Sequence, residues 1–240
     1  MRIPQGHWLK TLPIAHRGLW GGDIEENTLT AYKNAVHNGY AIEIDLWASK
    51  DGVVYSFHDG FLKRMTGVEG HINDFDSSYI NTLKIVGTDE GIPTLRDVLF
   101  AVNGKVPILI EIKNQKDELI VERVLDELFE YQGEIAIQSF NPLHINKVRK
   151  IAPHIIRGVL GTSKADGEKW LTRHVLKHLS LNFLVKPDFI SMRYADLPLP
   201  KRKTKNKAVL GWTVKSQEVY DKIKNHCDNI IFEHFIPNKD

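Results

Sequence analysis

The sequence predicts an α/β fold, and within that class a closed (β/α)8 barrel of the TIM type. Eight short apolar runs rich in Ile and Val recur along the chain, and helical patterns lie between most of them. Continuous apolar runs of this length are typical of parallel strands that are covered on both faces. The chain has 240 residues. One barrel of this kind needs roughly 250 residues, so we expect residues 1–240 to form a single domain.

The eight predicted strands share this composition, and eight favours a closed barrel over an open sheet. They span residues 13–18, 41–47, 107–113, 135–140, 156–161, 188–194, 208–214 and 229–235.

The predicted helices are set by apolar positions at helical spacing and by capping or terminating residues. They are residues 27–38, a helix capped by Thr94 and ended by Gly104, residues 117–132, a helix begun by Asn141-Pro142, residues 167–181, and a helix capped by Ser216.

Three stretches depart from strict alternation. Asp51-Gly52 lies between two strand-like runs, which predicts a β-hairpin in place of the start of the crossover after the second strand. A two-residue turn there would pair Lys50 with Val53. Residues 60–93 form a long connection, which we interpret as a short insertion over the mouth of the barrel. Residues 196–207 carry a cluster of lysines, which we interpret as a solvated loop rather than a phosphate-seeking or membrane-seeking patch.

Composition excludes several classes of protein. The formal net charge of +2 is too small to indicate a nucleic-acid partner. Cys227 is the one cysteine, so no intrachain disulfide can form. The first twelve residues do not have the pattern of a signal peptide, and no apolar run approaches the roughly 18 residues of a membrane span. We therefore expect a cytoplasmic protein without a stable membrane anchor.

Charged side chains gather on the inner faces of two predicted strands. Because strand residues alternate between faces, Glu43 and Asp45 share one face, and Glu111 and Lys113 share one face of the next barrel strand. Barrel enzymes place their sites at the carboxyl ends of the strands, where these groups would meet. Three carboxylates suit Mg²⁺ or Ca²⁺, so we expect one divalent cation. The alternative is a buried network of Lys113 and carboxylates with no metal.

Two histidines are also expected at this mouth. His16 ends the first strand, and His58 ends the hairpin return, opposite Asp45 in the predicted register. Imidazoles beside a metal can act as general base and general acid near neutral pH. Arg17 offers a planar fork for an anion, and Gly18 would let the backbone approach a ligand closely. A site with a cation, an Arg and a Lys is suited to a phosphate or another oxyanion.

At this point the residues resemble a known family, the glycerophosphodiester phosphodiesterases, which have a phospholipase-C-like barrel. The resemblance rests on motifs that occur in the family's order over nearly the whole chain. They are "HRG" (16–18), "ENT" (26–28), "EIDLWASKDG" (43–52), "VVYSFHD" (53–59), "LIEIK" (109–113), "QSFNP" (138–142) and "GWTV" (211–214). The chain departs from the family pattern at Glu25, where Pro is usual, and at Phe232-Glu233, where a Thr-Asp pair is frequent.

The resemblance implies metal-dependent hydrolysis of a glycerophosphodiester to sn-glycerol 3-phosphate and an alcohol. It implies the following roles: His16 and His58 as the catalytic pair, Glu43, Asp45 and Glu111 as metal ligands, Arg17 and Lys113 as phosphate-binding residues, and Glu26 and Asn27 as an element near the site. Phe140 and Trp212 match apolar walls around the alcohol, although barrel packing explains them equally well. Two alternatives stay open: the same chemistry on another phosphodiester, as in a lysophospholipase D, and a non-catalytic barrel that binds phosphate esters.

Overall fold

The computed structural model describes residues 3–115, 117–164, 174 and 178–238. The chain consists of two compact units: Arg17–Glu134, and Met1–His16 together with Ile135–Asp240. No helix in the described part of the chain is both long enough and apolar enough to cross a membrane.

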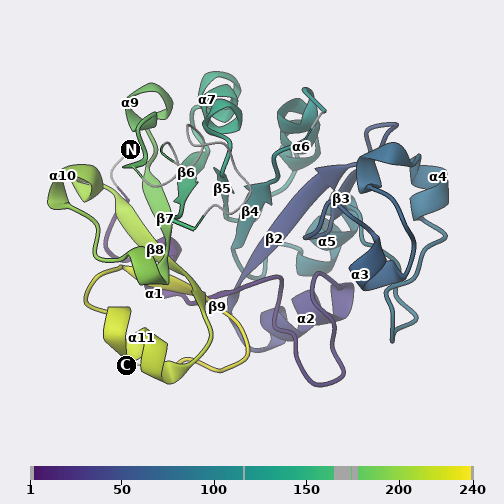
Figure 1. Cartoon of the computed structure of the whole chain (residues 1–240), viewed down its shortest axis with the longest axis horizontal. Coiled ribbons are helices and arrows are strands. Elements are labelled where there is room, and N and C mark those ends of the chain that lie inside the picture. Colours follow the sequence, from purple (N-terminus) through teal and green to yellow (C-terminus); the bar gives the residue numbers. More distant parts are fainter. Residues whose placement is uncertain (1–2, 116, 165–173, 175–177, 239–240) are drawn as a thin grey trace. The chain divides into compact units, whose positions relative to one another are not determined.

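The described residues of the Arg17–Glu134 unit form three strands, of which β2 is central (Figure 1). β2 pairs in parallel with β4, in a register that sets Asp45 beside Glu111, and antiparallel with β3. The elements of the unit are α2 (Leu29–His37), β2 (Ala41–Ala48), β3 (Val54–Ser56), α3 (Lys63–Thr66), η1 (Ile72–Asp74), α4 (Ser77–Ile80), α5 (Leu95–Val102), β4 (Ile108–Ile112) and α6 (Ile120–Leu128).

Local sequence explains where the main helices of this unit begin. The side chain of Thr28 accepts a hydrogen bond from the backbone N–H of Ala31 at the start of α2. Thr94 forms a capping box with Asp97 at the start of α5, as the predicted cap requires. Every residue of β2 and β4 is buried, which agrees with strands that are covered on both faces.

The predicted hairpin is confirmed, but its turn is one residue longer than expected. Val53 pairs with Ser49 rather than with Lys50, because the N–H of Ser49 donates to the Val53 carbonyl at 2.9 Å. The side chain of Ser49 accepts from the N–H of Val53 and donates to the Asp51 carboxylate, which holds a three-residue loop closed. Gly52, with φ of 88°, takes the left-handed position that such loops require.

The longer turn moves the register of β3 by one residue. The N–H of Phe57 donates to the carbonyl of Asp45 at 2.9 Å, so Phe57 and not His58 lies opposite Asp45. The expected pairing of Asp45 with His58 is therefore wrong, and His58 lies one residue further along the chain.

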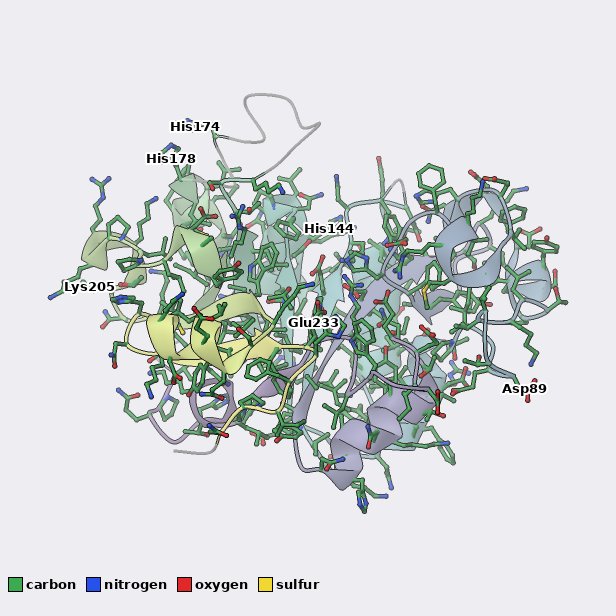
Figure 2. All side chains as sticks on the ribbon, turned by 60° about the horizontal axis from the view of Figure 1, so that its bottom comes forward. Asp89, His144, His174, His178, Lys205 and Glu233 are labelled. Atoms are coloured by element: carbon green, nitrogen blue, oxygen red, sulfur yellow. The ribbon has the colours of Figure 1, made fainter. Side chains whose placement is uncertain are left out.

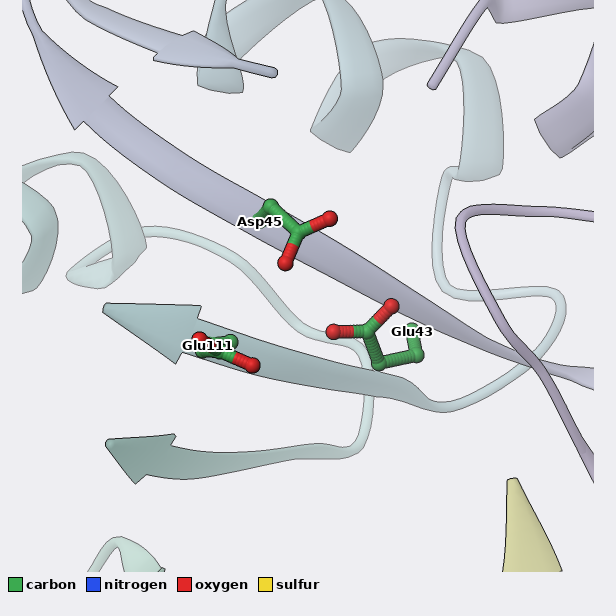
Figure 3. Close-up of side chains that lie close together, drawn as sticks. All are labelled: Glu43, Asp45 and Glu111. Atoms are coloured by element: carbon green, nitrogen blue, oxygen red, sulfur yellow. The ribbon is translucent and has the colours of Figure 1, made fainter. Parts of the chain in front are cut away.

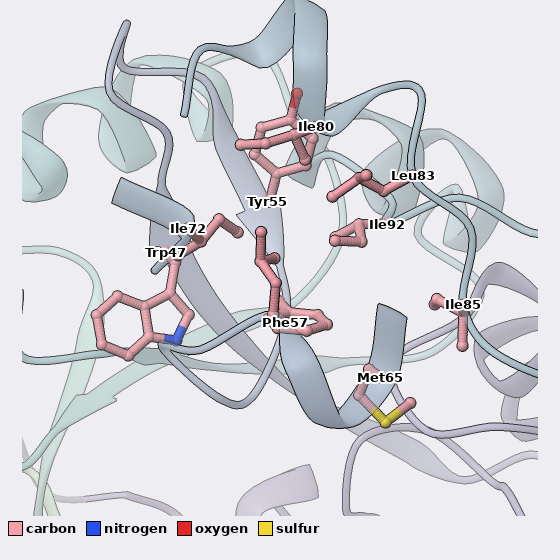
Figure 4. Packing of buried hydrophobic residues seen from close by; sticks show 10 residues of the cluster. Trp47, Tyr55, Phe57, Met65, Ile72, Ile80, Leu83, Ile85 and Ile92 are labelled. Atoms are coloured by element: carbon pink, nitrogen blue, oxygen red, sulfur yellow. The ribbon is translucent and has the colours of Figure 1, made fainter. Parts of the chain in front are cut away.

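The 60–93 insertion is not an irregular loop, because it forms α3, η1 and α4. Its apolar side chains pack against residues of β2 and β3 to form a separate buried cluster (Figure 4). The cluster consists of Trp47, Tyr55, Phe57, Leu62, Met65, Ile72, Ile80, Leu83, Ile85 and Ile92. Each fully buried side chain of this size contributes roughly 1.5–3 kcal/mol, so the insertion carries its own core.

In the second unit, the part that the structure describes forms six strands in the order β1-β9-β8-β7-β6-β5, and the pairings that the registers give are parallel. Its elements are α1 (Trp8–Thr11), β1 (Ile14–Ala15), β5 (Ile135–Ser139), α7 (Pro142–Ile151), β6 (Ile156–Gly161), α9 (Asn182–Val185), β7 (Phe189–Arg193), η2 (Tyr194–Asp196), α10 (Lys201–Thr204), β8 (Ala208–Val214), α11 (Gln217–Ile223) and β9 (Asn229–Phe232).

All eight predicted strands are present, and the helices capped by Asn141 and Ser216 begin where the sequence indicates. Most of the predicted 167–181 helix lies outside the described residues. The 196–207 stretch is not wholly a loop, because Lys201–Thr204 form one helical turn and present their basic side chains on its last turn.

Candidate active site

Three buried carboxylates form the centre of the candidate site. Glu43 and Asp45 project from β2 and Glu111 projects from β4, and all three turn to the same side of the two strands (Figure 3). One oxygen from each carboxylate lies within 4.8 Å of the others. Carboxylate oxygens are hard ligands, so this donor set fits a divalent cation such as Mg²⁺ or Ca²⁺.

Three acidic side chains buried together repel one another when they are ionised. Burial raises the pKa of Glu43 well above its ordinary value, and the charges of Asp45 and Glu111 raise it further. A bound cation would reverse this effect, because positive charge favours the ionised carboxylate.

Lys113 follows β4 and bridges two of the three acids. Its Nζ lies 2.7 Å from Asp45 Oδ1 and 2.8 Å from Glu111 Oε1. Burial alone would lower the pKa of Lys113, but the charges of Asp45 and Glu111 outweigh burial and raise it. The network of Lys113 and carboxylates that the sequence offered as an alternative is therefore present, and the same carboxylates retain the geometry of a metal site.

Arg17 lies beside the same acids and is held from several sides. Its backbone N–H donates to Glu43 Oε2 at 3.1 Å, and its Nη1 donates to Glu26 Oε2 at 2.8 Å. The carboxylate of Asp45 lies 3.7 Å from Arg17 Nε. Arg64, from α3 of the insertion, binds the other oxygen of Glu26. Glu26 therefore orients two guanidinium groups.

Asn27 positions Asp45. Its Nδ2 donates to Asp45 Oδ2 at 3.2 Å, and its Oδ1 accepts a hydrogen bond from the hydroxyl of Tyr32 at 2.7 Å. Ser56 contacts both Tyr32 and Asn27, so β3 and α2 fix the amide from both sides. These contacts supply a physical role for Asn27, which the sequence alone does not give.

His58 is tied to a carboxylate and, through it, to a cation. Its Nδ1 lies 2.7 Å from Asp59 Oδ1, and Arg64 Nε donates to Asp59 Oδ2 at 2.5 Å. The hydrogen bond with His58 lowers the pKa of Asp59, and the contact with Arg64 lowers it further. Because Arg64 also binds Glu26, this insertion residue connects His58 with the group that holds Arg17.

His16 has an equivalent arrangement in the other unit. Its Nδ1 lies 2.5 Å from Glu233 Oε2, and Lys215 Nζ lies 2.5 Å from the other oxygen of Glu233. Burial of Glu233 raises its pKa, but the hydrogen bond from His16 and the contact with Lys215 outweigh burial and lower the pKa to about 2. Glu233 follows β9 (Figure 2).

Phe140 and Trp212 lie together in the second unit. Their ring centroids are 5.6 Å apart with an interplanar angle of 84°, an edge-to-face contact. The indole N–H of Trp212 is buried and has no hydrogen-bond acceptor among the described residues. The two rings therefore pack against each other, and their place beside a substrate stays a prediction.

Gly18 packs closely against α2. A Cβ at this position would lie 2.8 Å from Cβ of Ala31, and Gly18 has a φ of 84°. The glycine therefore lets the chain turn tightly against α2, and its close approach to a ligand stays a prediction.

Several residues of this site escape prediction from sequence. Asp59 could have been found, because it directly follows His58. The contacts of Glu233, Lys215 and Arg64 could not have been found, because tertiary folding brings these residues to the histidines or to the carboxylates beside them.

Comparisons with known proteins place these observations in a family. The model of the glycerophosphoryl diester phosphodiesterase family matches residues 16–235. The chain belongs to this family. The family consists of phosphoric diester hydrolases, and the chain is an enzyme of this class.

The similar proteins agree with the family. A glycerophosphodiester phosphodiesterase of Caldanaerobacter subterraneus is 35% identical over 167 residues, which cover 63% of this chain and 67% of that protein. A glycerophosphodiester phosphodiesterase of Thermotoga maritima has 26% identity and a TM-score of 0.73, over 92% of this chain and 94% of that one.

A phosphodiesterase of Oleispira antarctica, solved with its product sn-glycerol-3-phosphate, has 22% identity and a TM-score of 0.77. The match covers 92% of this chain and 93% of that one. The likeness confirms the predicted fold class, an α/β fold of the TIM-barrel type with β3 as an additional strand on β2.

Proposed function

We propose that this chain hydrolyses glycerophosphodiesters to sn-glycerol 3-phosphate and an alcohol. The observation that carries the proposal is the buried cluster of Glu43, Asp45 and Glu111, flanked by the cations Arg17 and Lys113. Acids suited to a metal beside two fixed positive groups match the needs of a phosphodiester, which carries a negative charge that grows as its P–O bond breaks. Family membership supports the same reaction.

Glu43, Asp45 and Glu111 would hold one divalent cation, Mg²⁺ or Ca²⁺. When bound, such a cation supplies charge that stabilises a phosphoryl oxygen in the transition state. Lys113 is tied to two of the same acids and Arg17 to Glu26. Their side chains are thus pre-oriented, and each would donate to phosphate oxygens without a large loss of side-chain freedom.

His16 and His58 would exchange protons with the substrate. In each ring the Nδ1 atom faces a carboxylate, which directs proton transfer to Nε2. One histidine takes the proton of the nucleophile, either the neighbouring glycerol hydroxyl or water, as the new P–O bond forms. The other donates a proton to the leaving alkoxide oxygen as the old P–O bond breaks. When the glycerol hydroxyl attacks, water then opens the cyclic phosphate.

Glu26 and Asn27 would act as positioning residues, because they hold Arg17 and Asp45 by direct hydrogen bonds. Phe140 and Trp212 would form an apolar wall for the substrate. The proposal treats residues 1–240 as one catalytic domain, since the family match begins at residue 16 and ends at residue 235. The cytoplasmic location remains a prediction.

The test is a panel of glycerophosphodiesters, with lysophosphatidylcholine as a further substrate, assayed for glycerol 3-phosphate with and without Mg²⁺ or Ca²⁺. We expect release of glycerol 3-phosphate that stops on chelation and returns with one of the two cations. Release that survives exhaustive chelation would contradict the metal site. Preferred release of choline from lysophosphatidylcholine would favour the lysophospholipase D alternative instead.

A matched pair of variants tests whether cation binding depends on a proposed ligand or on any carboxylate of the protein. Glu111→Gln removes one proposed ligand, whereas Glu130→Gln removes an exposed carboxylate that follows α6. We expect calorimetry to show loss of cation binding in the first variant and unchanged binding in the second. Equal cation binding by Glu111→Gln and the unaltered enzyme would overturn the ligand assignment.

A further inference from the structure

The pairing of β2 with β4 changes character directly after the carboxylate cluster. β4 ends at Ile112, which lies opposite Leu46 of β2. The N–H of Lys113 still donates to the carbonyl of Leu46 at 3.2 Å. In a parallel ladder that continued, the N–H of Ala48 would donate next to the carbonyl of Lys113. The structure has a different arrangement at this position, where Lys113 reaches the buried acids.

The side-chain amide of Gln115 lies between these two backbone groups. Its Oε1 accepts from the N–H of Ala48 at 2.8 Å, and its Nε2 donates to the carbonyl of Lys113 at 3.3 Å. Nε2 also donates to the carbonyl of Leu46 at 3.2 Å. An amide side chain has an acceptor and a donor, as a peptide group has, so Gln115 continues the ladder beyond the end of β4.

The 60–93 insertion holds the same amide through Asn73 of η1. Asn73 Nδ2 donates to the carbonyl of Ala48 at 2.5 Å and to Gln115 Oε1 at 3.3 Å. Ala48 is therefore bound at its N–H by Gln115 and at its carbonyl by Asn73. We call Gln115 and Asn73 the amide clasp. The clasp joins the end of β2, the segment after β4 and the insertion.

We propose that Gln115 is a positioning residue for Lys113, a cation that the proposed function assigns to the phosphate. Gln115 binds the carbonyl of Lys113 and Leu46 binds its N–H, so the backbone of Lys113 is held from both sides. From this backbone Nζ reaches Asp45 Oδ1 at 2.7 Å and Glu111 Oε1 at 2.8 Å. The inference rests on the proposed function, since it explains how that function's cation is fixed.

A lysine needs such support more than an arginine does. Its ammonium is a compact charge at the end of a flexible stem, so its place depends on where the backbone starts that stem. A positive group stabilises a developing phosphate charge best when it is already in place before the reaction. Loss of the clasp should therefore slow the reaction even where the fold survives.

Gln115→Met tests the clasp, because Met keeps the length of the side chain and lacks the amide. We expect kcat/KM for a glycerophosphodiester to fall by about 10-fold to 100-fold, the usual cost of losing a residue that orients a functional group. Gln132→Met is the matched control. Gln132 Nε2 also donates to a carbonyl two residues earlier, that of Glu130 at 3.2 Å, but Gln132 is exposed. Unchanged kcat/KM in Gln115→Met would overturn the proposal.

Asn73→Ala weakens the clasp from the insertion and leaves Gln115 in place. It should lower kcat/KM by about 2-fold to 10-fold, the effect of one lost hydrogen bond. Circular dichroism checks that both variants are folded. If Gln115→Met does not fold, Asn73→Ala takes its place in the comparisons that follow, and an unchanged kcat/KM in that variant would then overturn the proposal.

The Lys113→Ala background separates positioning from a purely structural role. If Gln115 acts through Lys113, Gln115→Met should lower kcat/KM by less than about 2-fold once Lys113 has been removed, because residues that act together are not additive. A loss of the same size in both backgrounds would show that Gln115 supports the fold alone, and it would overturn the proposal.

Hydrogen exchange followed by NMR tests the clasp without turnover. The amide protons of Ala48 and Lys113 should exchange faster in Gln115→Met, whereas that of Asp97, which Thr94 caps, should keep its rate. Unchanged exchange at Ala48 and Lys113 would overturn the clasp. If the unaltered chain releases no glycerol 3-phosphate, the phosphodiesterase proposal fails, and faster exchange at these two amides still supports the clasp.

Discussion

The two candidate histidines each lie in a triad of imidazole, carboxylate and cation, but the two triads are built differently. The His16 triad consists of His16, Glu233 and Lys215, and the His58 triad consists of His58, Asp59 and Arg64. In each triad a carboxylate lies between an imidazole and a cation. The Glu233 side chain is 5% exposed, whereas the Asp59 side chain is 27% exposed.

The difference shows two ways to orient an imidazole. Glu233 is separated from His16 by 217 positions, so this triad forms only when β1 and β9 pair. Asp59 directly follows His58, so its contact is available locally, and Arg64 of the insertion then restrains it. A buried hydrogen bond is electrostatically stronger than an exposed one, so we expect the His16 triad to depend more on its carboxylate.

Removal of either imidazole tests whether the triads are equivalent, and this is the largest expected effect. His16→Ala and His58→Ala should each lower kcat by about 10²-fold to 10⁴-fold, because each loses one proton transfer. Circular dichroism should show that both variants remain folded. Turnover close to that of the unaltered enzyme in either variant would remove that histidine from the mechanism.

The leaving group then separates the two roles. A glycerophosphodiester of p-nitrophenol needs little protonation as it leaves, so it should restore most of the rate to the variant that lacks the general acid. The variant that lacks the base should stay slow with this substrate. Equal rescue of both variants would contradict the assignment of one histidine as general acid and the other as general base.

Removal of the carboxylates sharpens the comparison between buried and exposed triads. Glu233→Gln should lower kcat by about 10-fold to 100-fold, the usual cost of losing a group that orients a functional side chain. Asp59→Asn should cost less, because solvent reaches its site. KM should change little in both, and Glu233→Asp should recover part of the rate only if orientation is the cause. A larger loss in Asp59→Asn would reverse the ranking.

Removal of the outer cations gives a smaller effect. Lys215→Ala should change kcat by less than about 3-fold, since its side chain is 61% exposed and exposed ion pairs contribute little. Arg64→Ala should lower kcat by about 3-fold to 10-fold, because Arg64 also holds Glu26. Lys222→Ala and Lys63→Ala are matched controls that remove exposed ion pairs elsewhere. Equal effects of Arg64→Ala and Lys63→Ala would exclude a role through Glu26.

The smallest effect concerns acid stability. The pKa of Glu233 is lowered to about 2 from its ordinary value of 4.5. A lowered folded-state pKa stabilises the fold above pH 4.5, and this stabilisation is lost as the pH falls toward 2. Glu233→Gln should therefore reduce the change in the free energy of unfolding over that interval, measured by urea titration at successive pH values. An unchanged pH dependence would show that the contact with His16 does not stabilise the fold.

Much of the fold could be predicted because its signals are local. Continuous apolar runs specified all eight barrel strands, and Thr94, Asn141 and Ser216 capped helices as their side chains allow. The turn at Asp51 was mispredicted by one residue because side-chain bonds of Ser49 stabilise a longer loop. The insertion helices escaped prediction because each is a single turn that depends on packing against β2 and β3.

The candidate site likewise has residues that local sequence patterns predict and residues that they do not predict. Glu43, Asp45 and Glu111 could be placed together from strand alternation and the parallel register of β2 and β4. Contacts that depend on tertiary structure could not be read from the sequence. Glu233 appeared there only as a departure from a family pattern, and no local signal marks Arg64 as the residue that binds both Glu26 and Asp59.

The backbone of Arg17 places folding and chemistry in conflict at one residue. Arg17 has a φ of 59°, in the left-handed region that costs a non-glycine residue about 1–3 kcal/mol. Glycine would relieve this strain but would delete the guanidinium beside Asp45. The position is locally frustrated, because the residue that best satisfies the turn cannot hold an anion. Selection for thermostability alone would therefore tend to erase this cation, whereas selection for turnover would keep it.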